Sequence, residues 1–271
     1  MLRTEMRNEN SMHIDRMTTM EMVSLMNGEN MNSVLAVEKA LPQIAKAVDV
    51  VAEAMGNGGK LVYIGAGTSG RLGILDAAEC PPTFGVEDWV VQGIIAGGPQ
   101  RVFKAGENAE DIYEDGVRDA KEILKAEDVL VGISAAGGAR YVVGALETAK
   151  ALGCTAIAVT SNADTAITKV ADIAIVCDTG PEVITGSTRL KAGNSQKFVL
   201  NMLSTCAMIK TGKVYENLMI NLKPSNHKLR GRVIRITSAI LDCTEEEALP
   251  LLEQNGWDIR KTVEGCKQKE I

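Results

Sequence analysis

Histidine is almost absent from this chain of 271 residues, which has only His13 and His227. Neither histidine belongs to a spacing that is typical of metal ligands, and no two cysteines form a C-x-x-C pair. The six cysteines are scattered along the chain, at Cys80, Cys154, Cys177, Cys206, Cys243 and Cys266. This pattern is typical of buried thiols in a reducing cytoplasm and argues against disulfides or a zinc site. We therefore expect no metal, and chemistry that rests on carboxylates, hydroxyls and backbone groups.

The chain also lacks long hydrophobic runs and an excess of positive charge. Its apolar stretches are too short, and too often interrupted by glycine or charge, to span a bilayer. Residues 1–15 lack the apolar core of a secretion signal. With 29 Lys and Arg against 35 Asp and Glu, the formal net charge is −6, which argues against sequence-independent binding of nucleic acid. We expect a cytoplasmic globular protein with neither a membrane nor a nucleic-acid partner.

Short apolar runs bounded by turn residues are what the chain does have. They lie at residues 61–65, 89–95, 129–134, 155–160 and 173–177. The runs are rich in β-branched residues, do not alternate with polar residues, and are separated by helix-like stretches. Such a pattern predicts a parallel sheet covered on both faces. The expected fold class is α/β, with a doubly wound parallel sheet of five strands.

Helices are expected before and after this sheet. Apolar residues in 34–55 form one helical stripe, which Pro42 should kink or split in two. Residues 196–210 predict a long, almost uncharged helix, buried within the domain or against a partner subunit. Near the end of the chain, Thr244 and Glu247 form a capping box that opens a further helix. We place a small helical module at residues 237–271, separate from residues 1–236.

Residues 61–73 (LVYIGAGTSGRLG) carry glycines in the G-x-G-x-x-G spacing after the first predicted strand. A dinucleotide-binding fold also needs an acidic residue at the end of the second strand, where this chain has residues 96–98, Ala-Gly-Gly. The helix should also end early, because Pro81 and Pro82 follow Cys80. The loop remains suited to a compact phosphate, because Gly67 brings the backbone close and Thr68 and Ser69 add hydroxyls. The alternative is a tight turn in which Ser69 only caps the helix.

Two longer motifs carry a family resemblance: residues 63–85 (YIGAGTSGRLGILDAAECPPTFG) and 180–203 (GPEVITGSTRLKAGNSQKFVLNML). They closely resemble the N-acetylmuramic acid 6-phosphate etherases, which belong to the sugar isomerase (SIS) group of sugar-phosphate-binding domains. The resemblance runs from residues 4–15 through 212–229 into the C-terminal module. It implies an SIS domain with N-terminal helices, a sugar-phosphate substrate, no cofactor, and a homodimer in which two subunits surround one sugar. The C-terminal module resembles ubiquitin-associated-type helical folds.

The family's reaction removes D-lactate from C3 of the sugar, leaving N-acetylglucosamine 6-phosphate. The leaving group at C3 lies β to the C1 aldehyde of the open sugar, so the reaction needs a base for the C2 proton and an acid for the departing oxygen. The resemblance assigns the acid to Glu79, whose place at a helix C-terminus opposes the helix dipole. It assigns the base to Glu110. From the residues alone, the acidic cluster around Glu110 reads as a solvated helix face; its other members are Glu107, Asp111, Glu114 and Asp115.

Two loops should complete the sugar-phosphate site. In residues 185–193 (TGSTRLKAG), the resemblance favours Ser187 and Thr188 over Arg189 and Lys191 as pocket residues. The alternative is a capped helix start with basic residues on the surface. After the third predicted strand, the family has a Ser-Gly-Arg-Thr-Pro loop, where this chain reads SAAGG at residues 134–138. The family's hydroxyls are missing there. Ser134 and the backbone N–H groups of Gly137 and Gly138 are the expected replacements.

Two other functions remain open. The vertebrate glucokinase regulatory protein is a more distant relative, so the chain could be a non-catalytic sugar-phosphate sensor. A sensor needs neither of the two carboxylates, and the regulator has two SIS domains where this chain has one. An aldose–ketose isomerase would also remove the C2 proton, but it needs no acid over C3. These considerations favour the lyase.

Overall fold

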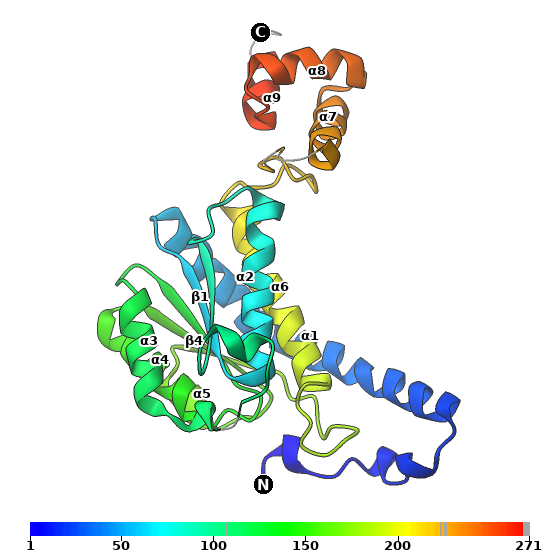
Figure 1. The fold of residues 1–271 in the computed structure, drawn as a ribbon, viewed down its shortest axis with the longest axis vertical. Helices are drawn as coiled ribbons and strands as arrows, with labels where there is room; N and C mark the ends of the chain where they lie inside the picture. The colour runs from blue at the N-terminus through cyan, green and yellow to red at the C-terminus, as the bar shows by residue number, and fades with distance from the viewer. Residues whose placement is uncertain (107, 223, 225–226, 268–271) are drawn as a thin grey trace. The chain divides into compact units, whose positions relative to one another are not determined.

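The computed structural model describes residues 1–106, 108–222, 224 and 227–267. One sheet contains the strands β1 (Leu61–Gly65), β2 (Val91–Ile95), β3 (Val129–Ile133), β4 (Thr155–Thr160) and β5 (Ile173–Val176). All pairs are parallel, in the order β2-β1-β3-β4-β5 (Figure 1). The predicted α/β fold with a five-stranded parallel sheet is confirmed, and each strand lies within the apolar run that predicted it.

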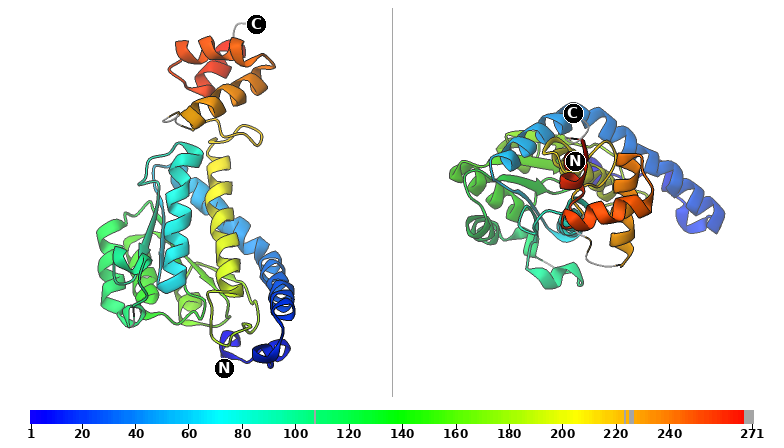
Figure 2. Two further views of the ribbon diagram at one scale, coloured as in Figure 1. Left: turned by 45° about the vertical axis from the view of Figure 1, so that its right-hand side comes forward. Right: turned by 90° about the horizontal axis from the view of Figure 1, so that it is seen from above.

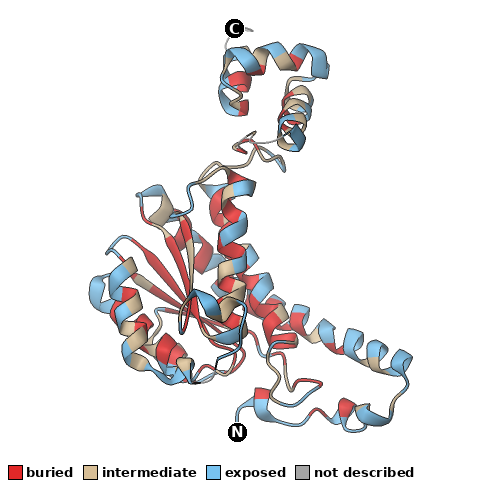
Figure 3. Cartoon of the chain, in the orientation of Figure 1, coloured by how far each residue is buried: buried red, intermediate tan, exposed pale blue. Residues whose placement is uncertain are grey.

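The two faces of the sheet are covered by different helices. On one face, α3 (Tyr113–Ile123) and α4 (Arg140–Leu152) pack over a core that includes Val62, Ile64 and Leu130. Alternate residues of a strand point to opposite faces. Tyr63 therefore points the other way, where its hydroxyl donates to Asp76 of α2 (Gly67–Phe84) at 2.9 Å and to the carbonyl of Leu200 in α6 (Lys191–Lys210) at 3.3 Å. Figure 2 shows α2 and α6 side by side, and Figure 3 shows that buried residues are concentrated on the strands of the sheet.

The helix α1 (Thr19–Gly56) packs against β3 and β5. It begins at a capping box between Thr18 and Glu21 and ends before Gly58, whose φ of +88° favours glycine. Of the two outcomes expected at Pro42, a kink or a split, the split is wrong, because the helix is continuous through this residue. Pro42 removes one backbone donor, and the buried side chains on either side hold the two halves in one helix. A short helix, α5 (Ala166–Val170), lies between β4 and β5.

The end of α2 also differs from the sequence expectation. The helix was expected to stop after Cys80, but it continues through Pro81 and Pro82 to Phe84. The φ of proline is compatible with a helix, and the N–H of Gly85 still donates to the carbonyl of Pro81 at 2.9 Å. The two prolines remove only the donors that would face the carbonyls of residues 77 and 78. Similarly, α6 starts at residue 191, five residues before its predicted start.

The described residues form two compact units, Met1–Ala78 with Trp89–Ala207 and Glu79–Asp88 with Met208–Ile271. The second unit contains α7 (His227–Leu241), α8 (Glu245–Gln254) and α9 (Ile259–Lys267). The predicted capping box of Thr244 and Glu247 is present at the start of α8. A separate apolar core holds this unit together; it consists of Ile220, Leu222, Val233, Ile236, Leu252, Ile259 and Val263.

Candidate functional site

The strand order reverses between β1 and β3, so the chain leaves these neighbouring strands in opposite directions. In open α/β sheets, ligands bind beside the carboxyl ends of the strands at this reversal. The turn before α2 follows β1 there, and the loop of residues 134–139 follows β3. The sheet therefore brings the two predicted phosphate-binding segments to one edge.

The junction between β1 and the first turn of α2 requires its glycines because two chain segments nearly touch there. A Cβ on Gly70 would lie 2.6 Å from the carbonyl oxygen of Gly65 and 2.7 Å from Ile95. Gly67 has a φ of +53°, in the left-handed region that glycine adopts readily. In the first turn of α2, the N–H of Gly70 donates to the backbone carbonyl of Ala66, just before the helix. The N–H groups before it belong to the start of the helix, where unpaired backbone donors commonly bind anions.

Thr68 and Ser69 differ in their surroundings. Ser69 is buried, and its hydroxyl donates to Oε1 of Gln196 in α6 at 3.0 Å. Thr68 is half-buried and lies against Gly193. Gly193 also contacts Thr188, because its N–H donates to the Thr188 carbonyl at 3.0 Å. The structure thus brings the predicted residues Thr68, Ser69 and Thr188 together around the first turn of α6.

The start of α6 cannot itself bind an anion, because a carboxylate already covers it. The N–H groups of Lys191 and Ala192 donate to the Glu182 carboxylate at 3.0 and 2.9 Å. Glu182 is fully buried, and this burial raises the pKa of its carboxyl group although the two backbone hydrogen bonds lower it. Two helix N-termini therefore lie close together. Glu182 covers that of α6, whereas none of the described side chains accepts a hydrogen bond from the first N–H groups of α2.

Lys191 has a structural role in this loop. Its ammonium pairs with Glu29 of α1, and both side chains are almost completely buried. Asn8 and Asn10 also donate to the Glu29 carboxylate, at 2.9 and 2.8 Å. Burial raises the pKa of Glu29, but the bonds from Lys191, Asn10 and Asn8 outweigh it and leave the pKa lowered. The N-terminal segment and α1 thereby fix the start of α6 and the loop of Ser187 and Thr188.

The loop after β3 is closed by its own hydrogen bonds. The N–H of Gly137 donates to both the carbonyl and the hydroxyl oxygen of Ser134, at 3.1 Å each, so it is used within the loop. Gly137 has a φ of +77°, and a Cβ there would lie 2.3 Å from Thr165. Ser134 is buried and accepts this bond, which leaves its own hydroxyl hydrogen as a donor. The N-terminal segment supports the loop, because Asn162 bridges Thr4 and the carbonyl of Ala135, at 3.1 Å each.

A polar cavity of about 410 Å³ opens beside the α2 turn, and we call it the α2 cavity. Its lining includes Gly67, Arg71, Ala96, Arg101, Glu110 and Asp111. Its volume falls in the range of small-molecule sites. Two guanidinium groups and an open helix N-terminus give one part of the cavity a positive character, which suits a phosphate. The same cavity also carries carboxylates, as a proton transfer next to a phosphate requires.

The two arginines were not predicted, and the surrounding chain fixes Arg71 in place. Arg71 donates to the carbonyls of Val102 and Arg101, at 2.9 and 2.8 Å. The Nε of Arg101 is buried and has no hydrogen-bond partner among the described residues. Arg71 lies two residues after Ser69 in the same glycine-rich motif, and this proximity in the sequence was the available signal. Arg101 follows a glycine turn and becomes a candidate only once β2 is placed beside β1.

Glu110 is the predicted carboxylate that lies in this cavity. It belongs to a single 3₁₀ turn, residues 109–111, which follows Asn108 at a φ of +68°. The structure separates the members of the acidic cluster. Glu110 and Asp111 line the α2 cavity, whereas Asp115 pairs with Arg118 on α3. Glu107 lies outside the described residues.

Glu79 is exposed and lies in the second compact unit, a turn and a half before the end of α2. Twelve residues separate it from Gly67, which corresponds to about 18 Å along the helix axis. The helix thus carries the open N-terminus at one end and Glu79 near the other. Because the helix continues to Phe84, Glu79 is also further from the negative helix end than expected.

Within the described residues, no three His, Cys, Asp or Glu side chains are grouped so that they could hold a metal ion. None of the described helices is long and apolar enough to cross a membrane.

Comparison with known proteins gives consistent matches. The family model of the glucokinase regulatory protein N-terminal SIS domain matches residues 43–150, and that of the SIS domain matches residues 100–206. An N-acetylmuramic acid 6-phosphate etherase of Clostridium botulinum is 50% identical over 99% of this chain and 91% of the relative. The enzymes of that name from Symbiobacterium thermophilum and Vibrio atlanticus are 51% and 49% identical over 96% of this chain, covering 87% and 85% of their own lengths.

Solved structures support the fold. A putative phosphosugar isomerase from Bacteroides fragilis is 20% identical, with a TM-score of 0.54, over 72% of this chain and 94% of that chain. A phosphoheptose isomerase from Francisella tularensis is 18% identical, with a TM-score of 0.52, over 70% and 98%. At these identities, the likeness extends to the fold of the sheet domain.

Proposed function

Because this chain belongs to the N-acetylmuramic acid 6-phosphate etherase family, we propose that it is a lyase that cleaves the D-lactyl ether of N-acetylmuramic acid 6-phosphate. The products are N-acetylglucosamine 6-phosphate and D-lactate. The observation that carries this proposal is the α2 cavity, in which an open helix N-terminus and two arginines face the same space as Glu110.

The phosphate takes the positive part of this cavity. The first N–H groups of α2 bind its oxygens, and Arg71 and Arg101 supply charge-assisted hydrogen bonds. The α6 turn and the loop of residues 134–139 hold the rest of the sugar through Ser187, Thr188 and Ser134. Ser69 shapes the turn from behind, because its hydroxyl points to Gln196. Gly137 contributes the shape of its loop, because its N–H is already used.

Glu110 acts as the base in the elimination. Its carboxylate takes the C2 proton of the open sugar, and the electron pair forms a C2=C3 double bond conjugated with the C1 aldehyde. The C3–O bond breaks, and the departing lactate oxygen takes a proton from the acid. Water then adds its hydroxyl group to C3 and a proton returns to C2. The net reaction consumes one water, and each proton that is removed is returned.

The acid is Glu79 of a second copy of the chain. A single hexose phosphate is much shorter than the axial separation of about 18 Å between Gly67 and Glu79 on α2. A phosphate bound at one helix N-terminus therefore needs a Glu79 from another α2 to reach its C3 oxygen. This assignment makes the homodimer part of the active site.

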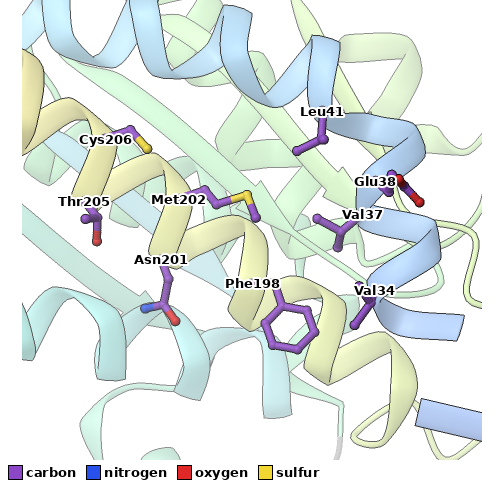
Figure 4. Close-up of a pocket in the computed structure, with 9 residues that line it drawn as sticks. All are labelled: Val34, Val37, Glu38, Leu41, Phe198, Asn201, Met202, Thr205 and Cys206. Carbon is purple, nitrogen blue, oxygen red and sulfur yellow. The ribbon is translucent and has the colours of Figure 1, made fainter. Parts of the chain in front are cut away.

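An apolar groove of about 630 Å³ between α1 and α6 fits the surface that such a dimer would cover. Val34, Val37 and Leu41 of α1 face Phe198 and Met202 of α6 across it (Figure 4). The side chains of Val34, Leu41 and Phe198 are 48%, 44% and 38% exposed in the single chain. Exposed apolar surface of this kind is typical of protein–protein contacts.

The test is to incubate the purified protein with N-acetylmuramic acid 6-phosphate in water enriched in oxygen-18 and to follow both products by mass spectrometry. Release of D-lactate, with the heavy oxygen on the sugar, is the expected result. Heavy oxygen on the lactate would contradict cleavage at the C3–O bond. Binding without turnover would support the non-catalytic sugar-phosphate sensor instead. The match of residues 43–150 to the glucokinase regulatory protein domain is the observation that favours this second function.

A further inference from the structure

The end of α2 that carries Glu79 is a weak place in the helix. Pro81 and Pro82 have no N–H, so the carbonyls of Ala77 and Ala78 lose their helical donors one turn before them. Helix ends fray when their hydrogen bonds are missing. An exposed Glu79 on such an end has no fixed position unless another part of the chain holds the helix.

The segment around Asn221 holds this end. Gly85 terminates α2 with a φ of +64°, and a Cβ there would lie only 1.7 Å from the carbonyl oxygen of Asn221 and 3.3 Å from the Asn221 Cβ. The two backbones are therefore in direct contact at a point where only glycine fits. Phe84, the last residue of α2, is buried beside this contact.

Asn221 is in turn anchored in the C-terminal helices. Its neighbours Ile220 and Leu222 are 6% and 4% exposed and belong to the apolar core shared with α7, α8 and α9. Before it, Tyr215 and Leu218 exchange two backbone hydrogen bonds, of 3.1 and 2.8 Å, which fix the turn that leads into this segment. A continuous path of packed residues thus runs from the core of the three helices to the end of α2.

We propose that the C-terminal three-helix unit, formed by α7, α8 and α9, positions Glu79. The backbone contact between Gly85 and Asn221 is the joint that connects this unit to the end of α2. The proposal rests on the proposed function, because Glu79 is the acid there. It gives these helices a catalytic purpose, although none of their own side chains takes part in the reaction. Gly85 and Asn221 are positioning residues.

This role predicts a selective defect. Loosening the joint displaces the acid, which is needed only when the C3–O bond breaks. Glu110 belongs to the first compact unit, so removal of the C2 proton should continue. A general loss of structure would lower both steps together. The ratio of C2 proton exchange to lactate release therefore distinguishes positioning from mere stability.

The experiment compares the full-length Gly85→Ala and Gly256→Ala variants in deuterated water with N-acetylmuramic acid 6-phosphate. Both glycines have positive φ, +64° and +65°, so alanine strains the backbone equally. A Cβ at Gly256 meets no atom within 4 Å, which makes Gly256→Ala the matched control. Leu252→Ala leaves a cavity at a fully buried position in the core of the three helices. It therefore loosens the unit without changing any residue of α2.

Gly85→Ala and Leu252→Ala should lower the rate of lactate release about tenfold or more. This loss is a part of the roughly 10²–10⁴-fold rate enhancement that a general acid supplies. Proton exchange at C2 and KM should stay near their wild-type values. Gly256→Ala should leave both rates unchanged. Equal losses of exchange and release, or full release in both loosened variants, would overturn the proposal. A wild-type protein that releases no lactate would instead refute the proposed function.

Discussion

Ser69 and Gln196 join the first turns of α2 and α6 through a buried hydrogen bond of 3.0 Å. Ser69 is 7% exposed and Gln196 is 2% exposed, so water has little access to this bond. The Nε2 of Gln196 is buried without a hydrogen-bond partner among the described residues. α6 thus fixes the orientation of a hydroxyl in the turn to which we assign the phosphate.

The Gln196→Leu variant should weaken substrate binding more than it weakens the fold. An unpaired buried hydroxyl costs about 1–3 kcal/mol, but the variant also removes the unpaired Nε2, so we expect the free energy of unfolding to fall by only about 1 kcal/mol. KM should rise severalfold because the turn loses its support. Denaturant unfolding and steady-state kinetics measure the two effects. In the Ser69→Ala background the same substitution should cost less; purely additive effects would contradict the coupling.

The Glu110→Gln variant should lose both C2 proton exchange and lactate release, because the base acts first. A general base typically contributes about 10²–10⁴-fold, so both rates should fall by at least the lower value. Proton exchange in deuterated water and lactate release are measured on the same sample. Asp111 also lines the α2 cavity, so Asp111→Asn is the matched control and should retain most activity. Exchange that survives in Glu110→Gln but not in Asp111→Asn would move the base to Asp111.

The Glu79→Gln variant should separate the two steps. Without the acid, the lactate oxygen has no proton donor, so we expect release to fall about 10²-fold or more while exchange at C2 persists. Glu79 is exposed in the single chain, so the thermal melt should not change. Lactate release near the wild-type rate would show that another group is the acid.

The homodimer assignment is tested by mixing these two variants. If one site combines Glu110 of one copy with Glu79 of the other, a mixed dimer of Glu79→Gln and Glu110→Gln chains contains one intact site and one doubly altered site. Random assembly gives half mixed dimers, so co-expression should recover about a quarter of the wild-type rate. If each site were built within one chain, no intact site would form and the mixture would stay inactive. Each variant expressed alone provides the background rate.

The sheet was predictable from the sequence because short β-branched runs leave few alternatives, and its order places residues 67–69 and 134–137 at one edge. The end of α2 was not predictable from the sequence, because two successive prolines normally terminate a helix. Only the contact between Gly85 and Asn221 shows why α2 continues through Pro81 and Pro82. Tertiary contacts overrode the local preference there.

The site was only partly predictable for a related reason. Gly67, Thr68 and Ser69 are adjacent in the sequence, so a local motif identifies them. Arg101 and Gln196 reach the same region from distant segments, and nothing in their own neighbourhoods distinguishes them from surface and core residues. The choice of Glu110 within an acidic cluster came from the family resemblance, and the cavity now adds a geometric reason by separating it from Asp115.

The buried pair of Glu29 and Lys191 should make stability depend on pH in a defined direction. The pKa of Glu29 is lowered in the folded chain from its ordinary value of 4.5, so the folded state favours the ionised carboxylate. Its contribution to stability is therefore fully present above pH 4.5 and is lost as the pH falls through the lower folded pKa. Denaturant unfolding should show that Glu29→Gln destabilises the protein by about 3–5 kcal/mol at neutral pH, because Lys191 is left buried and unpaired.

This difference between wild type and Glu29→Gln should shrink as the pH falls below 4.5, because the wild-type carboxylate is then protonated and resembles the amide. Glu21 is the control: hydrogen bonds from Thr18 lower its pKa too, but it is exposed at the start of α1, so Glu21→Gln should have a much smaller effect. Because Lys191 begins α6 and Asn8 and Asn10 also contact Glu29, Glu29→Gln should additionally loosen the loop of Ser187 and Thr188 and raise KM. A difference in unfolding free energy that stays constant between pH 7 and pH 3 would show that the ionised pair does not stabilise the fold.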